Sequence, residues 1–361
     1  MNAVAIFMMV FSVIGALDRI LGNHFGLGKE FERGFMLLGD LALSMIGMIV
    51  ISPLLAQLLS PALNGLYEAI RIDPSSITSM LFANDLGGSA LATEVAKDVQ
   101  LGRFNGMVVT SMMGGTISFT IAFALGAVKE SQHKPLLLGL LCGIVTIPFG
   151  CFLGGLVLRI PLAQLLYNLL PLLLFSLLVA AGLLFFPGAS TKTFGLLGVG
   201  IRILITVGLI FGIVRSLSGV EIIKGLNTLE DAGLICLNAA VVMTGAFPLL
   251  HILSRLLSRQ LKGLGRRIGI NETSSLGFVS CLANSISTFG MMGKMDEKGV
   301  MLNAAFAVSA AFVFGDHLAF TLAYDPGCLA GVITGKLFAG VLSLLVANFM
   351  YNRLKKTSNN R

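Results

Sequence analysis

Two carboxylates of this sequence lie far from the ends of apolar segments and are its strongest candidates for chemistry. Asp85 lies in SMLFANDLGGSALATEVA, where a pair of glycines permits a helix break, and Asp316 lies in FVFGDHLAFT. A charged side chain at such a position is costly, so each carboxylate is by default a candidate ligand for a cation or a proton. The alternative is an ion pair with a neighbouring basic group, or a cap on a broken helix.

Polar side chains beside these acids can hydrogen-bond a small solute. Asn84 directly precedes the first acid, and the stretch LANSISTF at 282–289 supplies Asn284 and Ser285. Amides and hydroxyls both donate and accept hydrogen bonds. His317 follows the second acid and can relay a proton, because imidazole titrates near neutral pH. Helix-packing contacts, or a histidine satisfied by its neighbours, explain the same residues without a ligand.

Other acids have a simpler explanation. Glu94 is close enough in sequence to Lys97 to pair with it near the membrane interface. Asp40 opens one apolar run, and Glu230 and Asp231 open another. Acids in the first turn of a helix complement its dipole, so these residues are set aside as ligands.

Composition indicates a protein built for lipid. Of the 361 residues, 55% are hydrophobic and 12% are charged, and the mean hydropathy is +0.90. Exposure of so much apolar surface is unfavourable in water, whereas the hydrocarbon of a bilayer requires an apolar protein surface. The net charge of +7 comes from basic residues at the ends of apolar runs, which favours membrane orientation over a nucleic-acid partner.

Apolar runs long enough to cross about 30 Å of hydrocarbon as helix predict about nine crossings. They lie at roughly 2–17, 34–59, 103–127, 135–158, 162–186, 196–216, 230–254, 299–323 and 327–351. Two further apolar stretches, 76–96 and 271–293, are rich in Gly, Ser, Thr and Asn and are predicted to be re-entrant or broken helices. The expected fold is an all-α integral membrane protein, a polytopic helical bundle of about 9–11 transmembrane segments.

Loop charge predicts how the chain is threaded. The loop at 255–267 and the tail at 352–361 are basic and are therefore expected to be cytoplasmic. An even number of crossings must separate them, so 271–293 is expected to enter the membrane and return. Counting the crossings back from the loop at 255–267 places the amino terminus outside the cytoplasm. The segment 76–96 is then expected to enter the membrane from the face opposite to that of 271–293.

The order of elements predicts an internal repeat. Two spans, an interrupted segment and two more spans occur in 1–158, and the same order recurs in 196–351, with 162–186 linking the halves. Ala83-Asn84 recurs as Ala283-Asn284, and FTIA as FTLA. Inverted repeats with interrupted helices are a common plan of secondary transporters, with substrate near the midplane. We expect one membrane transport domain, 1–351, ahead of the basic tail.

Motifs of enzymes and metal sites are not found in the sequence. It has no P-loop, GxSxG or HExxH pattern, and its five cysteines lie in or beside apolar segments without a CxxC pair. Three of its four histidines lie at span ends or in loops. We therefore expect no enzyme activity, no metal and no cofactor, although an intramembrane enzyme stays as a less favoured alternative.

Three stretches resemble the ethanolamine permease family of bacterial ethanolamine-utilisation operons. They are FANDLGGSALA (82–92), GFVSCLANSISTFGMM (277–292) and AFAVSAAFVFGDHLAFT (305–321). The similarity runs through essentially the whole chain, and FVFGDHL is its most specific part. The first stretch departs more from the family pattern, and the chain is somewhat short for the family.

The resemblance implies uptake of ethanolamine across the bacterial inner (cytoplasmic) membrane by a multi-pass protein. The expected partners are this small molecule and membrane lipid. On this view Asp85 or Asp316 faces the ammonium, while Asn284, Ser285 and His317 orient the hydroxyl. Facilitated diffusion and ion-coupled transport both stay open, as do another amine, an amino acid or a nucleoside as substrate. A homodimer is the commonest closed assembly and is the expected oligomer if one forms.

Overall fold

The computed structural model describes residues 3–82 and 87–359, without the side chains of 257–259, 261, 264, 358 and 359. In chain order the elements are α1 (Ala3–Ile20), α2 (Leu27–Leu41), η1 (Ala42–Ile46), α3 (Gly47–Ile70), α4 (Pro74–Leu81), α5 (Gly88–Val95), α6 (Val99–Phe104), η2 (Asn105–Gly114), η3 (Thr116–Thr120), α7 (Ile121–Ala127), η4 (Glu130–Gln132), α8 (His133–Ile144), α9 (Ile147–Val157), α10 (Leu162–Phe185), α11 (Pro187–Ser218), α12 (Leu229–Ile268), α13 (Glu272–Ala283), α14 (Ser285–Met291), η5 (Met292–Lys294), α15 (Glu297–Ala310), α16 (Asp316–Tyr324), η6 (Pro326–Cys328) and α17 (Leu329–Asn359).

Eight described helical segments are long and apolar enough to cross a membrane, and no strand occurs among the described residues. This confirms the predicted all-α, polytopic membrane fold. The predicted span at 299–323 is two helices, α15 and α16, with residues 311–315 between them. Hydropathy cannot detect this break, because the intervening residues are as apolar as a helix that crosses lipid.

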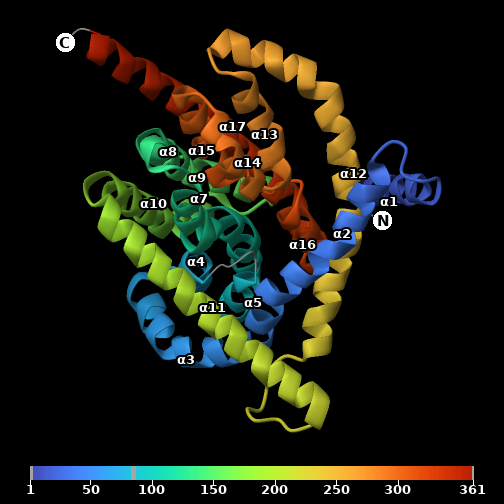
Figure 1. Cartoon of the computed structure of the whole chain (residues 1–361). Coiled ribbons are helices and arrows are strands. Elements are labelled where there is room, and N and C mark those ends of the chain that lie inside the picture. The colour runs from blue at the N-terminus through green and yellow to red at the C-terminus, as the bar shows by residue number, and fades with distance from the viewer. Residues whose placement is uncertain (1–2, 83–86, 360–361) are drawn as a thin grey trace.

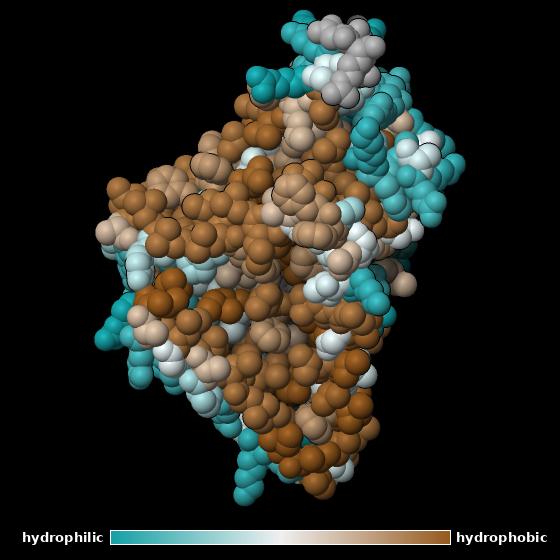
Figure 2. Space-filling view, turned by 90° about the vertical axis from the view of Figure 1, so that its left-hand side faces the viewer, coloured by the Kyte–Doolittle hydropathy of each residue, from teal (hydrophilic) through white to brown (hydrophobic). Residues whose placement is uncertain are grey.

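The long helices frame a centre made of short ones (Figure 1). α11 and α12 run along the outside of the molecule, and α4, α5, α7, α14 and α16 lie between them, while α17 projects past the bundle at its carboxyl end. Apolar side chains cover most of one broad face, with hydrophilic residues gathered at its extremities (Figure 2). Such a face is stable only against hydrocarbon.

Each interrupted segment begins and ends at the same side of the bundle, because residues at its two ends are hydrogen-bonded to each other. The Asp73 carboxylate, which caps α4, accepts hydrogen bonds from the backbone N–H groups of Lys97 and Asp98 after α5, each at 3.0 Å. At the other segment, the N–H of Asn271 before α13 donates to Asp296 after η5, at 2.8 Å. Because each pair joins the two ends of a segment, both segments are re-entrant hairpins.

A second pair of contacts repeats between the halves. In η2, Asn105 donates from its side chain to the Ser75 hydroxyl, at 2.8 Å. In α15, Asn303 donates from its side chain to the Ser274 carbonyl, at 2.9 Å. Each buried asparagine thus holds the first turn of a re-entrant helix. These contacts support the predicted halves 1–158 and 196–351, a division that we keep as a proposal.

Glycines bring α17 against α9. Gly150 and Gly154 of α9 face the backbone of Gly335 and Gly331 of α17, and a Cβ at any of the four would crowd the other helix. Small residues at this spacing permit close helix contact in lipid, where a hydrophobic driving force between helices is lacking. The close approach fixes the position of α17 beside the re-entrant segments.

Candidate functional site

The break between α13 and α14 lies against the break between α15 and α16. The N–H groups of Phe312 and Phe314 donate to the carbonyls of Cys281 and Leu282, at 3.1 and 2.9 Å. A Cβ at Gly315 would overlap the Ala283 carbonyl. Backbone groups freed by one broken helix are therefore satisfied by the other, which is how irregular backbone is tolerated at membrane depth.

Asn284 and Ser285 lie at the first of these breaks, as predicted. The Asn284 side chain accepts a hydrogen bond from the Ile286 N–H, at 2.7 Å, and so caps α14. Ser285 is fully buried, and its hydroxyl has no hydrogen-bond partner among the described residues. A buried hydroxyl without a partner is costly unless a ligand or water completes it.

Asp316 and His317 begin α16, directly after the second break. Asp316 is half-buried. His317 is buried, its ring centroid lies 5.4 Å from that of Phe312, and its Nδ1 has no hydrogen-bond partner in the described part of the chain. Phe312 has a positive φ of 61°, which is rare for a bulky residue and marks a strained position of the kind found at functional sites.

The remaining two predicted ligands, Asn84 and Asp85, lie outside the described residues. The flanking helices are nevertheless as expected, since α4 ends at Leu81 and α5 begins at Gly88. Within the segment 76–96, α4 and α5 are therefore two separate helices, one before these residues and one after them.

Lys336 is a buried cation that sequence reasoning missed. It lies within α17, is 1% exposed, and donates from Nζ to the Ser111 carbonyl of η2, at 2.7 Å. No described carboxylate lies within ion-pair distance of it. The signal was available, because a lysine in the middle of the apolar run 327–351 is as costly as the two intramembrane acids.

His317 and Lys336 line one small cavity, which we call the central cavity. Its volume is about 10 Å³, about enough for one water molecule. Phe119 and Phe312 form part of its wall. The other lining residues are Ser111, Met112, Gly115, Thr116, Thr120, Ala307, Val308 and Ala311. The cavity is therefore too small in this conformation to hold a solute larger than water.

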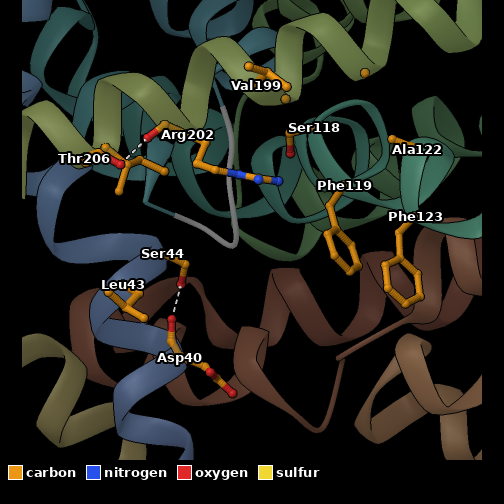
Figure 3. Close-up of a pocket in the computed structure, with 13 residues that line it drawn as sticks. Asp40, Leu43, Ser44, Ser118, Phe119, Ala122, Phe123, Val199, Arg202 and Thr206 are labelled. Atoms are coloured by element: carbon orange, nitrogen blue, oxygen red, sulfur yellow. Dashed lines mark hydrogen bonds between the residues drawn. The ribbon is translucent and has the colours of Figure 1, made fainter. Parts of the chain in front are cut away.

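A larger hollow, the α2–α11 pocket, adjoins the central cavity at Phe119. It holds about 520 Å³ between α2–η1, η3–α7 and α11, and it is lined by Asp40 and Arg202. Figure 3 shows Arg202 extending from α11 toward Ser118, with Phe119 and Phe123 side by side; their rings are stacked at 5.1 Å. From the sequence, Asp40 is not expected to be a ligand, whereas the fold places it in the lining of this pocket. Phe119 lines both hollows.

A third hollow, the α12–α13 pocket, reaches Asn284 from another direction. It holds about 290 Å³ and is lined by Glu30, His251 and Asn284, among others. Glu30 accepts a hydrogen bond from Arg33, at 3.2 Å, and lies 3.8 Å from His251. The fold thus brings His317 into the central cavity and Asn284 into this pocket, and neither hollow is lined by Ser285 or Asp316.

No cluster of His, Cys, Asp or Glu suited to a metal ion occurs among the described residues. The five cysteines are buried and unpaired with one another.

Comparison with known proteins gives the family. The family model for "Ethanolamine utilisation protein, EutH" matches residues 1–350. A Listeria monocytogenes protein named "Probable ethanolamine permease EutH" is 43% identical, over 98% of this chain and 95% of the relative. A Salmonella typhimurium protein of the same name is 38% identical, over 94% and 93%. "Uncharacterized protein YxeR" of Bacillus subtilis is 36% identical, over 97% and 94%.

No solved structure matches the chain. The bacterial relatives and the eight apolar helical segments make the chain a multi-pass protein of the bacterial inner membrane. Because the family model matches nearly the whole chain and the relatives are similar over their full length, the chain belongs to the EutH family of ethanolamine utilisation proteins.

Proposed function

We propose that this protein is an ethanolamine permease and not an enzyme. The observation that carries the proposal is its membership of a family whose curated members are named ethanolamine permeases. Its structure supports this, because two broken helices meet inside the bundle and present polar groups there. Discontinuous helices of this kind form the substrate sites of many transporters.

Ethanolamine has the chemistry that these groups suit. Its amine, like a lysine side chain, is protonated at neutral pH, and its hydroxyl both donates and accepts. We assign the ammonium to Asp316 or Asp85, and the hydroxyl to Asn284, Ser285 and His317. The Ser285 hydroxyl and His317 Nδ1 support this assignment, since neither has a partner among the described residues. Asn84 is a further candidate by its position beside Asp85.

The hollows supply a route. The central cavity is too small for ethanolamine, so substrate entry requires the walls to move, as alternating access demands. The α2–α11 pocket approaches it at Phe119, and the α12–α13 pocket reaches the α13–α14 break at Asn284. We assign these pockets to the path of the solute on either side of the junction of the two breaks.

Uptake of labelled ethanolamine into proteoliposomes tests the function and the site together. We expect Asp316→Asn or Asp85→Asn to reduce the initial rate at least 10-fold, because a buried charge-assisted contact is worth more than 1.4 kcal/mol, which is about tenfold. Glu68→Gln, on the exposed surface of α3, is the matched control and should retain full uptake.

The proposed site and the proposed function can be overturned by different results. Full activity in both carboxylate variants would overturn the site, whereas absence of uptake by the unaltered protein would overturn the function. Competition by unlabelled amines, amino acids and nucleosides distinguishes ethanolamine from the alternative substrates.

A homodimer is the expected assembly, and mass measurement in detergent tests it.

A further inference from the structure

Lys336 is a buried basic residue beside His317, to which we assign the hydroxyl of the substrate. It is 1% exposed, on a helix held against α9 by four glycines. Its Nζ shares the central cavity with His317, which directly follows the proposed cation ligand Asp316. The side chain cannot move its charge to the membrane surface by extending, because neighbouring elements enclose it.

The surroundings of Lys336 do not neutralise it. Among the described residues its hydrogen bond goes to one neutral carbonyl, that of Ser111, although an ammonium has three donors. The titratable side chains of the described chain that lie close enough to interact with its charge are Cys151 of α9, Cys281 of α13 and His317 of α16. None of these is an acid that is ionised at neutral pH.

A substrate whose hydroxyl binds His317 brings its ammonium close to Lys336, because His317 and Lys336 line one cavity and only two carbon atoms separate the two groups of ethanolamine. Two unit charges about 5 Å apart at an effective dielectric constant of about 20 repel strongly enough to weaken binding on the order of a hundredfold. Loss of one proton from the Lys336 ammonium removes this repulsion and leaves an amine that still donates to Ser111. Lys336 belongs to the protein and the substrate is the species carried, so the charge that leaves the site is the proton of Lys336.

We propose that Lys336 makes transport an exchange of one ammonium for one proton. On the outer side, the substrate ammonium enters as the Lys336 N–H bond breaks and the proton passes to water. On the inner side, the substrate leaves and Lys336 takes up a proton. One positive charge stays in the site throughout, so the cycle moves no net charge. This inference rests on the proposed function and specifies its energetics.

Measurement of electrical coupling tests the exchange. Proteoliposomes at equal internal and external pH are loaded with labelled ethanolamine at zero potential and at 100 mV inside-negative, with protein-free vesicles as the background. We expect the unaltered protein to bring ethanolamine to the same level inside and outside at both potentials, and to make the interior more alkaline as uptake proceeds. Accumulation of about 50-fold at 100 mV, without alkalinisation, would overturn the proposal.

Variants of Lys336 give the second arm. Lys336→Gln retains a donor for Ser111 and has no charge, so its uptake should become dependent on potential and approach about 50-fold accumulation at 100 mV. Lys336→Arg keeps a permanent charge and should lose uptake on the order of a hundredfold. Lys192→Gln, on the exposed side of α11, is the matched control and should behave as the unaltered protein.

These experiments distinguish a structural role of Lys336 from a role in the exchange of substrate for a proton. A merely structural Lys336 would change the amount of folded protein in Lys336→Gln but not its response to potential, and that result would overturn the proposal. If this variant does not fold, the electrical measurement on the unaltered protein decides alone. If the unaltered protein takes up no ethanolamine at all, the proposed function fails, and the exchange fails with it.

Discussion

Arg103 and Asp325 join two segments that are far apart in the chain. Arg103 donates from Nε and Nη2 to the two carboxylate oxygens of Asp325, at 2.7 and 2.6 Å. Arg103 lies in α6, and Asp325 lies between α16 and η6. Beside them the Thr93 and Tyr324 hydroxyls are 3.1 Å apart. The end of α16 is thereby fastened to the first half at the face where the first re-entrant hairpin begins.

This ion pair predicts a stability that falls in acid. Burial alone raises the pKa of Asp325, but the hydrogen bonds from Arg103, Cys328 and the Gly327 N–H, together with the Arg103 charge, outweigh it and hold this pKa below its ordinary value. A depressed carboxylate stabilises the fold fully above its unfolded pKa of about 3.9 and loses that effect as pH falls through the folded value. Asp325→Asn should lower stability by about 1 kcal/mol at pH 7, and by progressively less below pH ~4.

Thermal unfolding of the detergent-purified protein across this pH range measures the effect. A difference between the two proteins that stays constant down to pH ~3 would show that the carboxylate charge is not involved. Glu68→Gln again supplies a surface carboxylate control.

Gly315→Ala should disrupt the junction of the two breaks. Its Cβ would overlap the Ala283 carbonyl, which the break between α15 and α16 brings against it. We expect a loss of about 1–3 kcal/mol from overpacking and a large loss of ethanolamine uptake. Gly290→Ala in α14 is the matched control, because a Cβ there meets nothing within 4 Å. Equal stability and uptake in the two variants would contradict the packing described.

Asn105 and Asn303 should be equivalent in their effect on stability. Each is fully buried and donates to the first turn of one re-entrant helix. Replacement of either by alanine leaves a buried acceptor without its donor, at a cost of about 1–3 kcal/mol. Thermal unfolding measures this cost, with the exposed Asn352→Ala as a control expected within about 0.5 kcal/mol of the unaltered protein. A large effect from only one of the two buried asparagines would argue against the internal repeat.

Ser285→Ala should separate binding from folding. The hydroxyl is buried without a partner among the described residues, so its removal should not lower thermal stability. If ethanolamine supplies the missing partner, KM for uptake should rise about fivefold, the equivalent of one hydrogen bond of about 1 kcal/mol. An unchanged KM, or a fall in stability with it, would assign Ser285 to the protein framework.

Phe119→Ala should relax substrate selection. Phe119 lines both the α2–α11 pocket and the central cavity, so we expect loss of its ring to open a connection between them. We expect the ratio of ethanolamine to choline uptake to fall, because the bulkier amine gains room. Phe349→Ala on the exposed side of α17 is the control. A selectivity ratio equal to that of the control would show that Phe119 is not a barrier in the path.

The sequence by itself determined the membrane fold and the two segments that are re-entrant or broken. These are local properties, since the length of an apolar run and the polarity of a short stretch are set by neighbouring residues. It also identified Asp316 and His317, because an ionisable group inside an apolar run is costly wherever its partner lies.

Only the tertiary structure decided which of these groups meet. Contacts between segments far apart in the chain join the hairpin ends at Asp73 and Asp296. They also place His317 and Lys336 around one cavity and Asn284 in a different hollow. The break after Ala310 belongs to the same class, because the N–H groups of Phe312 and Phe314 donate to carbonyls of α13, far away in the chain. Such pairings are selected by packing of the whole bundle, and no local pattern of residues encodes them.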